Sequence, residues 1–283
     1  MCAHRLTTVS TALWVLLLAL FIWVPAEAVR LNVGVGRGLL VGAPKKSLWS
    51  PASLGSALVG WWDASQSSTI TIATGVSNWA SRSPATIALT QATGAHQPTY
   101  AANTVTSTGQ QGFNVAGWPA VYDVLAVGLP IPGAGLSSML ADSTHGYAQV
   151  IVTSVGNAVE AFAGTFGPYD TIDWTVSGMF YMSMPASTIP SGAYNGGTTT
   201  FSSAETFPTP QVNKAIGRDD TVQQWGTMQE MVVVNRKLTA AEYQFLIGYE
   251  ACKPAWAALG LQALIPAGSI YKSAASCSAF AYP

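Results

Sequence analysis

The chain has 283 residues, of which 49% are hydrophobic, and its 12 Lys and Arg against 13 Asp and Glu leave a formal net charge of -1. This length suits one large β domain or two small ones and allows a sizeable core. Only 9% of the residues are charged and no run of Lys and Arg occurs. Binding to nucleic acid through its phosphates needs such clusters, so the composition excludes it.

The N-terminus has the three parts of a secretory signal peptide. Arg5 provides the basic start, an uncharged apolar stretch covers 13–24, and an A-x-A motif predicts cleavage between Ala28 and Val29. The alternative is an uncleaved membrane anchor, but this stretch is shorter than the ~20 residues that span a bilayer. The sequence therefore predicts a secreted, periplasmic or cell-surface protein that meets the membrane only through this segment during export.

The cysteines support the same compartment. Cys2 leaves with the predicted signal, so Cys252 and Cys277 remain as a pair in an oxidising environment. A disulfide between them would close a loop of about 25 residues, stabilise the fold by about 3 kcal/mol and pin the C-terminal tail to the helix before it. The alternative is a pair of buried free thiols. A zinc site is not expected, because neither cysteine lies in a C-x-x-C motif.

The mature chain begins with a Gly/Pro-rich linker, residues 29–52, that adds at most an edge strand. Short apolar or alternating runs between turn residues then follow one another. They predict strands at 57–62, 69–72, 86–91, 120–127, 148–153, 158–163, 174–184, 197–202, 214–217 and 227–235. Many short strands with frequent turns indicate a β-sandwich or barrel.

One helix is expected, over 239–258. Thr239 is a good N-cap and Glu242 completes a T-x-x-E capping box. Leu246 and Ile247 lie on an apolar face at helical spacing, and Pro254 is expected to kink or end the helix. The tail after it, residues 259–283, is expected to be irregular and tethered by the disulfide.

Two segments together resemble a known family. The first runs from Leu58 to Ser65 and reads L-V-G-W-W-D-A-S; the second runs from Met228 to Tyr243 and contains E-M-V-V-V-N-R-K-L-T-A-A-E. They are similar to the opening strand and the closing strand–helix of the bacterial and phage branch of concanavalin A-like, laminin-G-like domains. The resemblance covers residues 53–258 and implies an all-β antiparallel jelly-roll sandwich with one C-terminal helix. The stretch from Val121 to Val124 departs from the family, because it lacks the glycine of a tight turn.

The candidate ligand site combines aromatic rings with carboxylate and amide groups in or beside predicted loops, as in a sugar-binding platform. Its members are Tyr169, Asp170, Asp173, Trp174, Tyr194 and Asn195. A loop cation, calcium above all, is a second interpretation of the acidic pair, and a solvated acidic loop is the third. No cofactor other than calcium is expected. Asp63 is expected to cap a turn, and adjacent Trp61 and Trp62 must face opposite sides of a strand.

Catalytic patterns are missing from the sequence. A retaining glycosidase on this sandwich needs two carboxylates ~5 Å apart, but no E-x-D-x-E or similar strand occurs. No G-x-S-x-G nucleophile elbow, zinc motif or calcium loop is found either. We therefore predict an exported, non-catalytic binding or adhesion module that recognises a glycan or cell-surface polymer. The alternatives are a structural surface, virion or prophage protein that uses the sandwich as a spacer, and a polysaccharide-acting hydrolase.

Overall fold

The chain divides into two units, Met1–Lys46 and Ser47–Pro283, and the computed structural model describes the second. The described residues are 48–85, 87–131, 136–142, 148–153, 158–160, 170–171, 176–184, 191–197, 200–202, 213–217 and 225–282. The predicted signal peptide, the Ala28–Val29 cleavage site and most of the predicted linker lie outside these residues.

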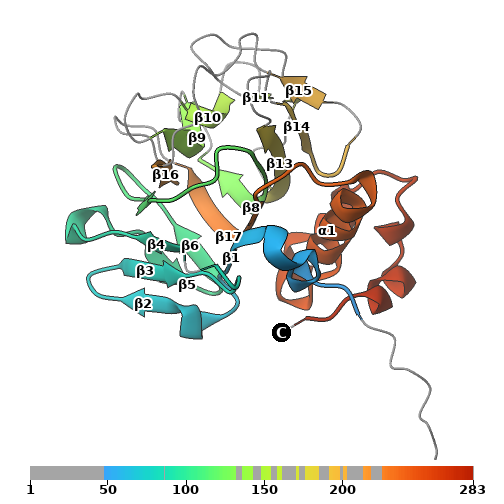
Figure 1. Ribbon diagram of the computed structural model, residues 1–283, viewed down its shortest axis with the longest axis horizontal. Helices are drawn as coiled ribbons and strands as arrows, with labels where there is room; N and C mark the ends of the chain where they lie inside the picture. The colour runs from blue at the N-terminus through green and yellow to red at the C-terminus, as the bar shows by residue number, and fades with distance from the viewer. Residues whose placement is uncertain are drawn as a thin grey trace, which may run out of the picture. The chain divides into compact units, whose positions relative to one another are not determined.

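Two antiparallel sheets make up the described part of this unit (Figure 1). The first sheet has the order β15-β14-β13-β8-β17-β6-β5, and β1 also pairs with β17. Its strands are β1 (Leu58–Asp63), β5 (Thr99–Ala101), β6 (Thr104–Thr106), β8 (Tyr122–Pro130), β13 (Gly178–Met184), β14 (Ser191–Tyr194), β15 (Thr200–Ser202) and β17 (Gly226–Val234).

The second sheet has the order β12-β11-β10-β9-β16-β7-β4-β3-β2. Its strands are β2 (Ile70–Ile72), β3 (Val76–Ala80), β4 (Ala88–Thr90), β7 (Phe113–Val115), β9 (Leu136–Asp142), β10 (Ala148–Thr153), β11 (Ala158–Glu160), β12 (Asp170–Thr171) and β16 (Lys214–Ile216). These findings confirm the predicted all-β antiparallel sandwich.

The two sheets enclose a core rich in aromatic side chains. Trp62 has no exposed surface and stacks on Trp118 with the ring centroids 6.2 Å apart. Trp79 from β3 and Phe113 from β7 pack against each other on the opposite sheet. Burying side chains of this size is the largest favourable term that such a domain has.

The C-terminal segment covers the outer face of the first sheet (Figure 1). Helix α1 (Ala240–Cys252) begins at the predicted Thr239 cap and ends before Pro254, six residues short of the expected end at 258. Pro254 lacks the N–H that the helix would need, and the chain continues as the 3-10 helix Pro254–Leu259. The tail contains α2 (Leu261–Leu264) and the 3-10 helices Ile270–Lys272 and Ala274–Ala279, so it is more regular than expected.

Because both faces of the first sheet are covered, its central strands are buried throughout. Nearly every residue of β8 and β17 is buried, and each strand contains four consecutive apolar residues, 124–127 and 231–234, as expected for strands covered on two sides. Trp61 and Trp62 point to opposite sides, as predicted: Trp62 enters the core, and Trp61 lies under α1 against Tyr249, with ring centroids 6.3 Å apart.

The start of the described chain is attached to its end. Trp49 donates its N–H to Ala279 at 3.0 Å, its carbonyl accepts from Ala281 at 3.0 Å, and its ring stacks on Phe245 of α1. The predicted disulfide is present: Cys252 at the end of α1 is bonded to Cys277, three residues before Phe280, which packs against Trp49. The chain before the first sheet strand starts with the 3-10 helix Pro51–Ala57. No helix within the described ranges is long and apolar enough to cross a membrane.

Candidate functional site

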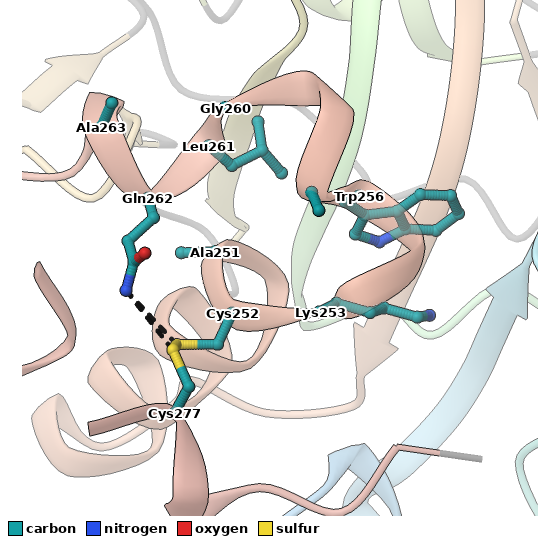
Figure 2. Close-up of a pocket in the computed structure, with 10 residues that line it drawn as sticks. Ala251, Cys252, Lys253, Trp256, Gly260, Leu261, Gln262, Ala263 and Cys277 are labelled. Atoms are coloured by element: carbon teal, nitrogen blue, oxygen red, sulfur yellow. Dashed lines mark hydrogen bonds between the residues drawn. A yellow bond between two sulfur atoms is a disulfide. The ribbon is translucent and has the colours of Figure 1, made fainter. Parts of the chain in front are cut away.

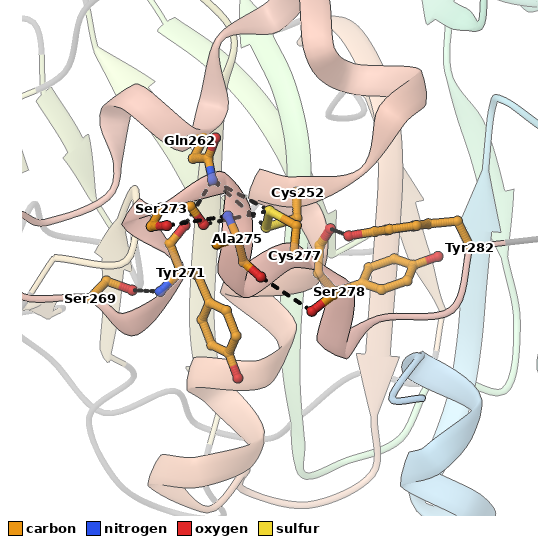
Figure 3. The surroundings of a disulfide bond; sticks show 10 residues. Cys252, Gln262, Ser269, Tyr271, Ser273, Ala275, Cys277, Ser278 and Tyr282 are labelled. Carbon is orange, nitrogen blue, oxygen red and sulfur yellow. Dashed lines mark hydrogen bonds between the residues drawn. A yellow bond between two sulfur atoms is a disulfide. The ribbon is translucent and has the colours of Figure 1, made fainter. Parts of the chain in front are cut away.

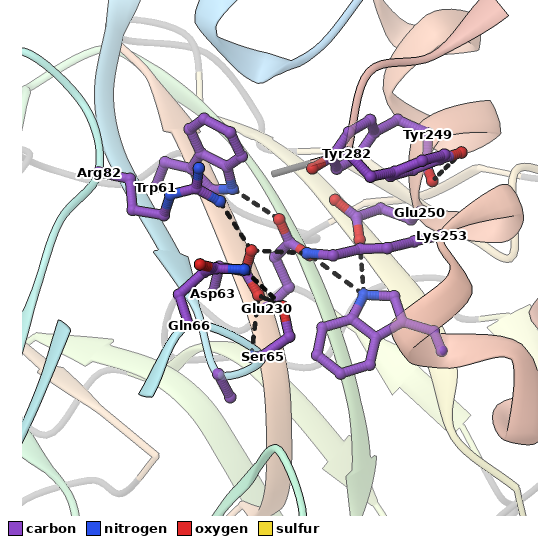
Figure 4. Close-up of polar contacts among 12 residues, drawn as sticks. Trp61, Asp63, Ser65, Gln66, Arg82, Glu230, Tyr249, Glu250, Lys253 and Tyr282 are labelled. Carbon is purple, nitrogen blue, oxygen red and sulfur yellow. Dashed lines mark hydrogen bonds and ion pairs between the residues drawn. The ribbon is translucent and has the colours of Figure 1, made fainter. Parts of the chain in front are cut away.

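A cluster of charged side chains lies between the first sheet and the C-terminal segment (Figure 4). The buried charge cluster consists of Asp63, Arg82, Glu230, Glu250 and Lys253. The Lys253 Nζ is 2.8 Å from Asp63 Oδ2 and 2.5 Å from Glu230 Oε2, while Arg82 donates to Asp63 Oδ2 at 2.9 Å. Apart from Arg82, every member is at most 3% exposed, so these charges are compensated inside the protein and not by water.

Indole groups complete the hydrogen bonds of the cluster. Trp61 donates its Nε1–H to Glu230 Oε1 at 2.6 Å, and Trp256 donates to Glu230 Oε2 at 3.1 Å. The other oxygen of Asp63 accepts from the N–H and hydroxyl of Ser65, at 2.9 and 2.6 Å. Asp63 therefore caps a turn, as predicted, and also carries two ion pairs that the sequence analysis missed. Buried charges persist only where partners of this kind satisfy them.

The surroundings of Glu250 favour its neutral form within this cluster. Burial, followed by the nearby Glu230 charge, raises the pKa of Glu250 well above its ordinary value. Burial lowers the pKa of Lys253, but the charges of Glu230, Glu250 and Asp63 outweigh burial, so the net change is upward. With Glu250 neutral, the carboxylates of Asp63 and Glu230 balance the cations of Arg82 and Lys253.

A second buried carboxylate attaches the start of α1 to the first sheet. Asp123 on β8 accepts hydrogen bonds from the Tyr181 hydroxyl and, at 2.7 Å, from the Leu238 N–H. Burial raises the pKa of Asp123, while hydrogen bonds from Ser183 and Tyr181 oppose that rise. Asp123 here, and Asp63 and Glu230 in the buried charge cluster, thus join the first sheet to the C-terminal segment.

One hollow, of about 430 Å³, opens beside the disulfide (Figure 2). It is lined mainly by small or apolar residues of α1 and the tail, among them Ala251, Gly260 and Leu261. The Gln262 amide donates to Cys277 Sγ at 3.4 Å and to the Tyr271 carbonyl at 3.1 Å (Figure 3). Lys253 and Trp256 border the hollow, but the Lys253 ammonium group belongs to the buried charge cluster (Figure 4). The Trp256 Nε1–H donates to Glu230 of that cluster. This hollow offers few polar groups to a ligand.

A second hollow, of about 290 Å³, lies on the second sheet where β4, β7 and β16 meet. Its polar side chains are those of Thr90, Asn114 and Asn213, all of which are exposed. Ala116 adds a methyl group, and the lining also includes Val115 and Lys214, which are buried and lie opposite each other in the register. This hollow presents hydroxyl and amide groups to solvent, which are groups that orient ligands in binding sites.

Two of the predicted site residues have described side chains. Tyr194 ends β14 and packs its ring on Phe180, with centroids 5.1 Å apart. Asn195 follows in a left-handed conformation, and its side-chain oxygen accepts the Met179 N–H at 2.8 Å. Asn195 is 9% exposed, so this side chain already supports the turn. Its role as a ligand contact, like that of Tyr194, stays a prediction.

The remaining predicted site residues are placed only in part. Asp170 belongs to β12, where it lies opposite Val159 of β11, and its side chain is outside the description. Tyr169, Asp173 and Trp174 fall outside the described residues. Across the ranges given above, no group of three or more His, Cys, Asp or Glu side chains gathers as metal ligands do. The predicted ligand site made of these residues therefore stays a prediction, as does a bound calcium ion.

No family model and no curated protein matches the chain in sequence. Solved structures match its fold. A sialidase of Trypanosoma rangeli in complex with a difluoro-KDN inhibitor superposes with a TM-score of 0.50 at 13% identity, covering 68% of this chain and 32% of that one. The same enzyme with the inhibitor DANA gives 0.50 at 15% identity, covering 72% and 35%. A sialyllactose-bound CBM40 module of a Ruminococcus gnavus sialidase gives 0.39 at 14%, covering 51% and 94%.

The chain thus spans about a third of the length of the sialidases that it matches. At this level of identity the likeness concerns the fold alone, and it agrees with the two antiparallel sheets described above. The chain shares the β-sandwich fold with part of these sialidases.

Proposed function

We propose that this protein is an exported, non-catalytic module that binds a glycan or a cell-surface polymer. The observation that carries the proposal is the outer face of the second sheet. The central strands of the first sheet are covered on both sides, whereas described residues of the second sheet, such as Thr90 and Asn114, present uncharged polar groups to solvent. Such a face suits the recognition of a neutral, hydroxyl-rich polymer.

The placement of the described carboxylate side chains supports binding over hydrolysis. Asp63, Asp123, Glu230 and Glu250 are buried and hold the sandwich to its C-terminal segment. Glu242 lies at the start of α1, where it pairs with Arg236. These five carboxyl groups already take part in hydrogen bonds or ion pairs, so they are poor candidates for the acid and nucleophile of a glycosidase.

Three finer assignments belong to this proposal. Export rests on the N-terminal signal pattern, and the Cys252–Cys277 disulfide is consistent with an oxidising compartment. Membership of the laminin-G-like branch rests on two segments. The W-W-D-A-S segment starts in β1, and the segment from Glu230 to Glu242 starts in β17, which pairs with β1. The domain boundaries at residues 53 and 258 come with that assignment, whereas the ligand contacts around Asp170 and Tyr194 are proposed from the side chains gathered there.

A glycan array tests the proposal. Purified protein is applied to neutral, sulfated and sialylated glycans with and without calcium, and a parallel assay follows reducing-sugar release from the same polysaccharides. We expect binding to at least one glycan class and no release of sugar. Silence across the array would refute the binding role, and measurable release would make the protein a hydrolase.

A further inference from the structure

A row of uncharged polar side chains crosses the second sheet. Thr71 on β2 lies opposite Asn78 on β3 in the strand register. Asn78 in turn lies opposite Thr90 on β4, and Thr90 lies opposite Asn114 on β7. Opposite residues of antiparallel strands share one face, and neighbouring strands lie ~4.8 Å apart. These four residues, the polar row, therefore line up over a distance of about 14 Å.

The buried neighbours of the row show that it points away from the core. Trp79 and Leu89, next to Asn78 and Thr90, have no exposed surface and lie between the sheets. Because side chains alternate along a strand, the polar row must face outward. The exposure agrees: Thr71, Thr90 and Asn114 are exposed and Asn78 is half-buried.

A strip of alanines runs beside the row on the same face. Ala80 on β3 lies opposite Ala88 on β4, two residues from Asn78 and Thr90 respectively. Ala116 follows Asn114 by two residues and is exposed. At this end the 290 Å³ hollow adds the amide of Asn213 to the row. On this face, the short alanine methyl groups thus lie next to a line of hydrogen-bonding groups.

Among the described residues, the part of this face that carries the polar row has no charged side chain. The strands β2, β3, β4 and β7 contain no Asp, Glu, Lys or Arg, and Lys214 of β16 is fully buried. A charged ligand would lose its hydration here without gaining an opposite charge. A neutral sugar chain suits this face in two ways. Its hydroxyl groups can form hydrogen bonds with the polar row, and its C–H surfaces can pack on the alanine strip.

We propose that the polar row and the adjoining hollow bind a neutral polysaccharide that runs across the strands β2, β3, β4 and β7. This inference rests on the proposed glycan-binding function and specifies its site and ligand class. The contacts come from short side chains on a sheet whose register is set by backbone hydrogen bonds, so the site is already formed before the ligand arrives.

Affinity electrophoresis with a polysaccharide panel tests this inference. The neutral members are laminarin, xylan and galactomannan, and the charged members are alginate and a sialylated glycan polymer. The test variant combines Thr90→Val with Asn114→Ala. The matched control combines Thr99→Val with Asn235→Ala, exposed positions on β5 and just after β17. Thermal unfolding of both variants verifies that each is folded.

We expect the wild type and the control to be retarded by at least one neutral polysaccharide. Each lost hydrogen bond should weaken binding about fivefold, so the test variant should bind at least tenfold more weakly. Equal retardation of wild type and test variant would overturn this site and leave the glycan-binding function standing. Retardation by charged members alone would overturn the ligand class, and no retardation at all would overturn both the inference and the proposed function.

Discussion

The buried charge cluster contains three carboxyl groups but only two cations. Glu250 is the carboxyl group whose negative charge would have no cation to balance it. Groups from every neighbouring element face it: Glu230 on β17, Asp63 on β1, Lys253 and Trp256 after α1, and Tyr282 in the tail. Burial and the Glu230 charge raise its pKa, which makes its ionisation costly to the folded state.

The first prediction concerns Glu250→Gln. The folded pKa of Glu250 lies above its unfolded value, so the folded state binds the extra proton and wild-type stability falls as pH rises from the unfolded pKa towards the folded one. Glutamine is always neutral and removes this loss. Between pH 5 and pH 9, the unfolding temperature of the wild type should therefore decline relative to that of the variant. Parallel curves from thermal unfolding would contradict a protonated Glu250.

The second prediction concerns Lys253, which pairs with both Asp63 and Glu230. Lys253→Met keeps the length of the side chain but leaves two buried carboxylates short of one cation. Removing one partner of a buried pair typically costs about 3–5 kcal/mol. Urea unfolding measures this loss, and Lys237→Met at an exposed position is the matched control, expected within about 0.5 kcal/mol of wild type. Equal stability of the two variants would show that the ion pairs contribute little.

At the scale of elements, α1 depends on a locally encoded start. Thr239 Oγ1 accepts the Glu242 N–H at 3.2 Å, and a Glu242 carboxylate oxygen accepts the Thr239 N–H at 2.9 Å. Arg236 adds a bidentate pair to Glu242, at 2.8 and 2.6 Å. The Arg236 hydrogen bond, with smaller contributions from Thr239, lowers the pKa of Glu242 to about 2. The capping box therefore stays charged across the usual pH range.

The third prediction tests this cap. Thr239→Ala removes the oxygen that satisfies a free N–H of the first turn, which typically costs about 1 kcal/mol. Thr239→Ser keeps that oxygen and should recover most of the loss. Denaturant unfolding of both variants makes the comparison. If alanine and serine were equally destabilising, the loss would come from the Thr239 methyl group and not from the cap.

At the scale of the whole described unit, the disulfide joins the C-terminal tail to the end of α1. Cys277 precedes the strand-like pairing of Trp49 with Phe280, and Phe280 and Tyr282 pack on Tyr249 of α1. Gly248 permits the close approach of the tail, because a Cβ there would overlap the Tyr271 ring. The bond thus holds the tail, and through it the start of the described chain, against α1.

The fourth prediction concerns the double change Cys252→Ser and Cys277→Ser. Opening a loop of this length should cost about 3 kcal/mol in the free energy of unfolding. Hydrogen exchange should rise first in residues 273–282 and around Trp49, while β8 and β17 stay protected. Uniformly faster exchange across the sheets would contradict a local tether. Reduction of the wild type with a small thiol provides an independent comparison.

Much of this fold was predictable from local sequence. The T-x-x-E box located the start of α1 because capping involves residues three apart, and most of β8 and β17 was recognised from short apolar or alternating runs between turn residues. The strands β3, β5, β6, β7, β9, β12 and β14 were not predicted. Several of these have three residues or fewer, so they are too short for a period of two to stand out.

The sequence by itself determined which groups the protein has: a cysteine pair, few charges, adjacent tryptophans that must diverge, and strands that alternate polar with apolar residues. Only the tertiary structure decided which groups meet. Trp61 reaches Glu230 across 169 positions of the chain, and Lys253 joins them after α1 folds back on the sheet. Likewise, Asn78 and Asn114 belong to one row only through the register of β3, β4 and β7. Register depends on hydrogen bonds between distant segments, which no local pattern encodes.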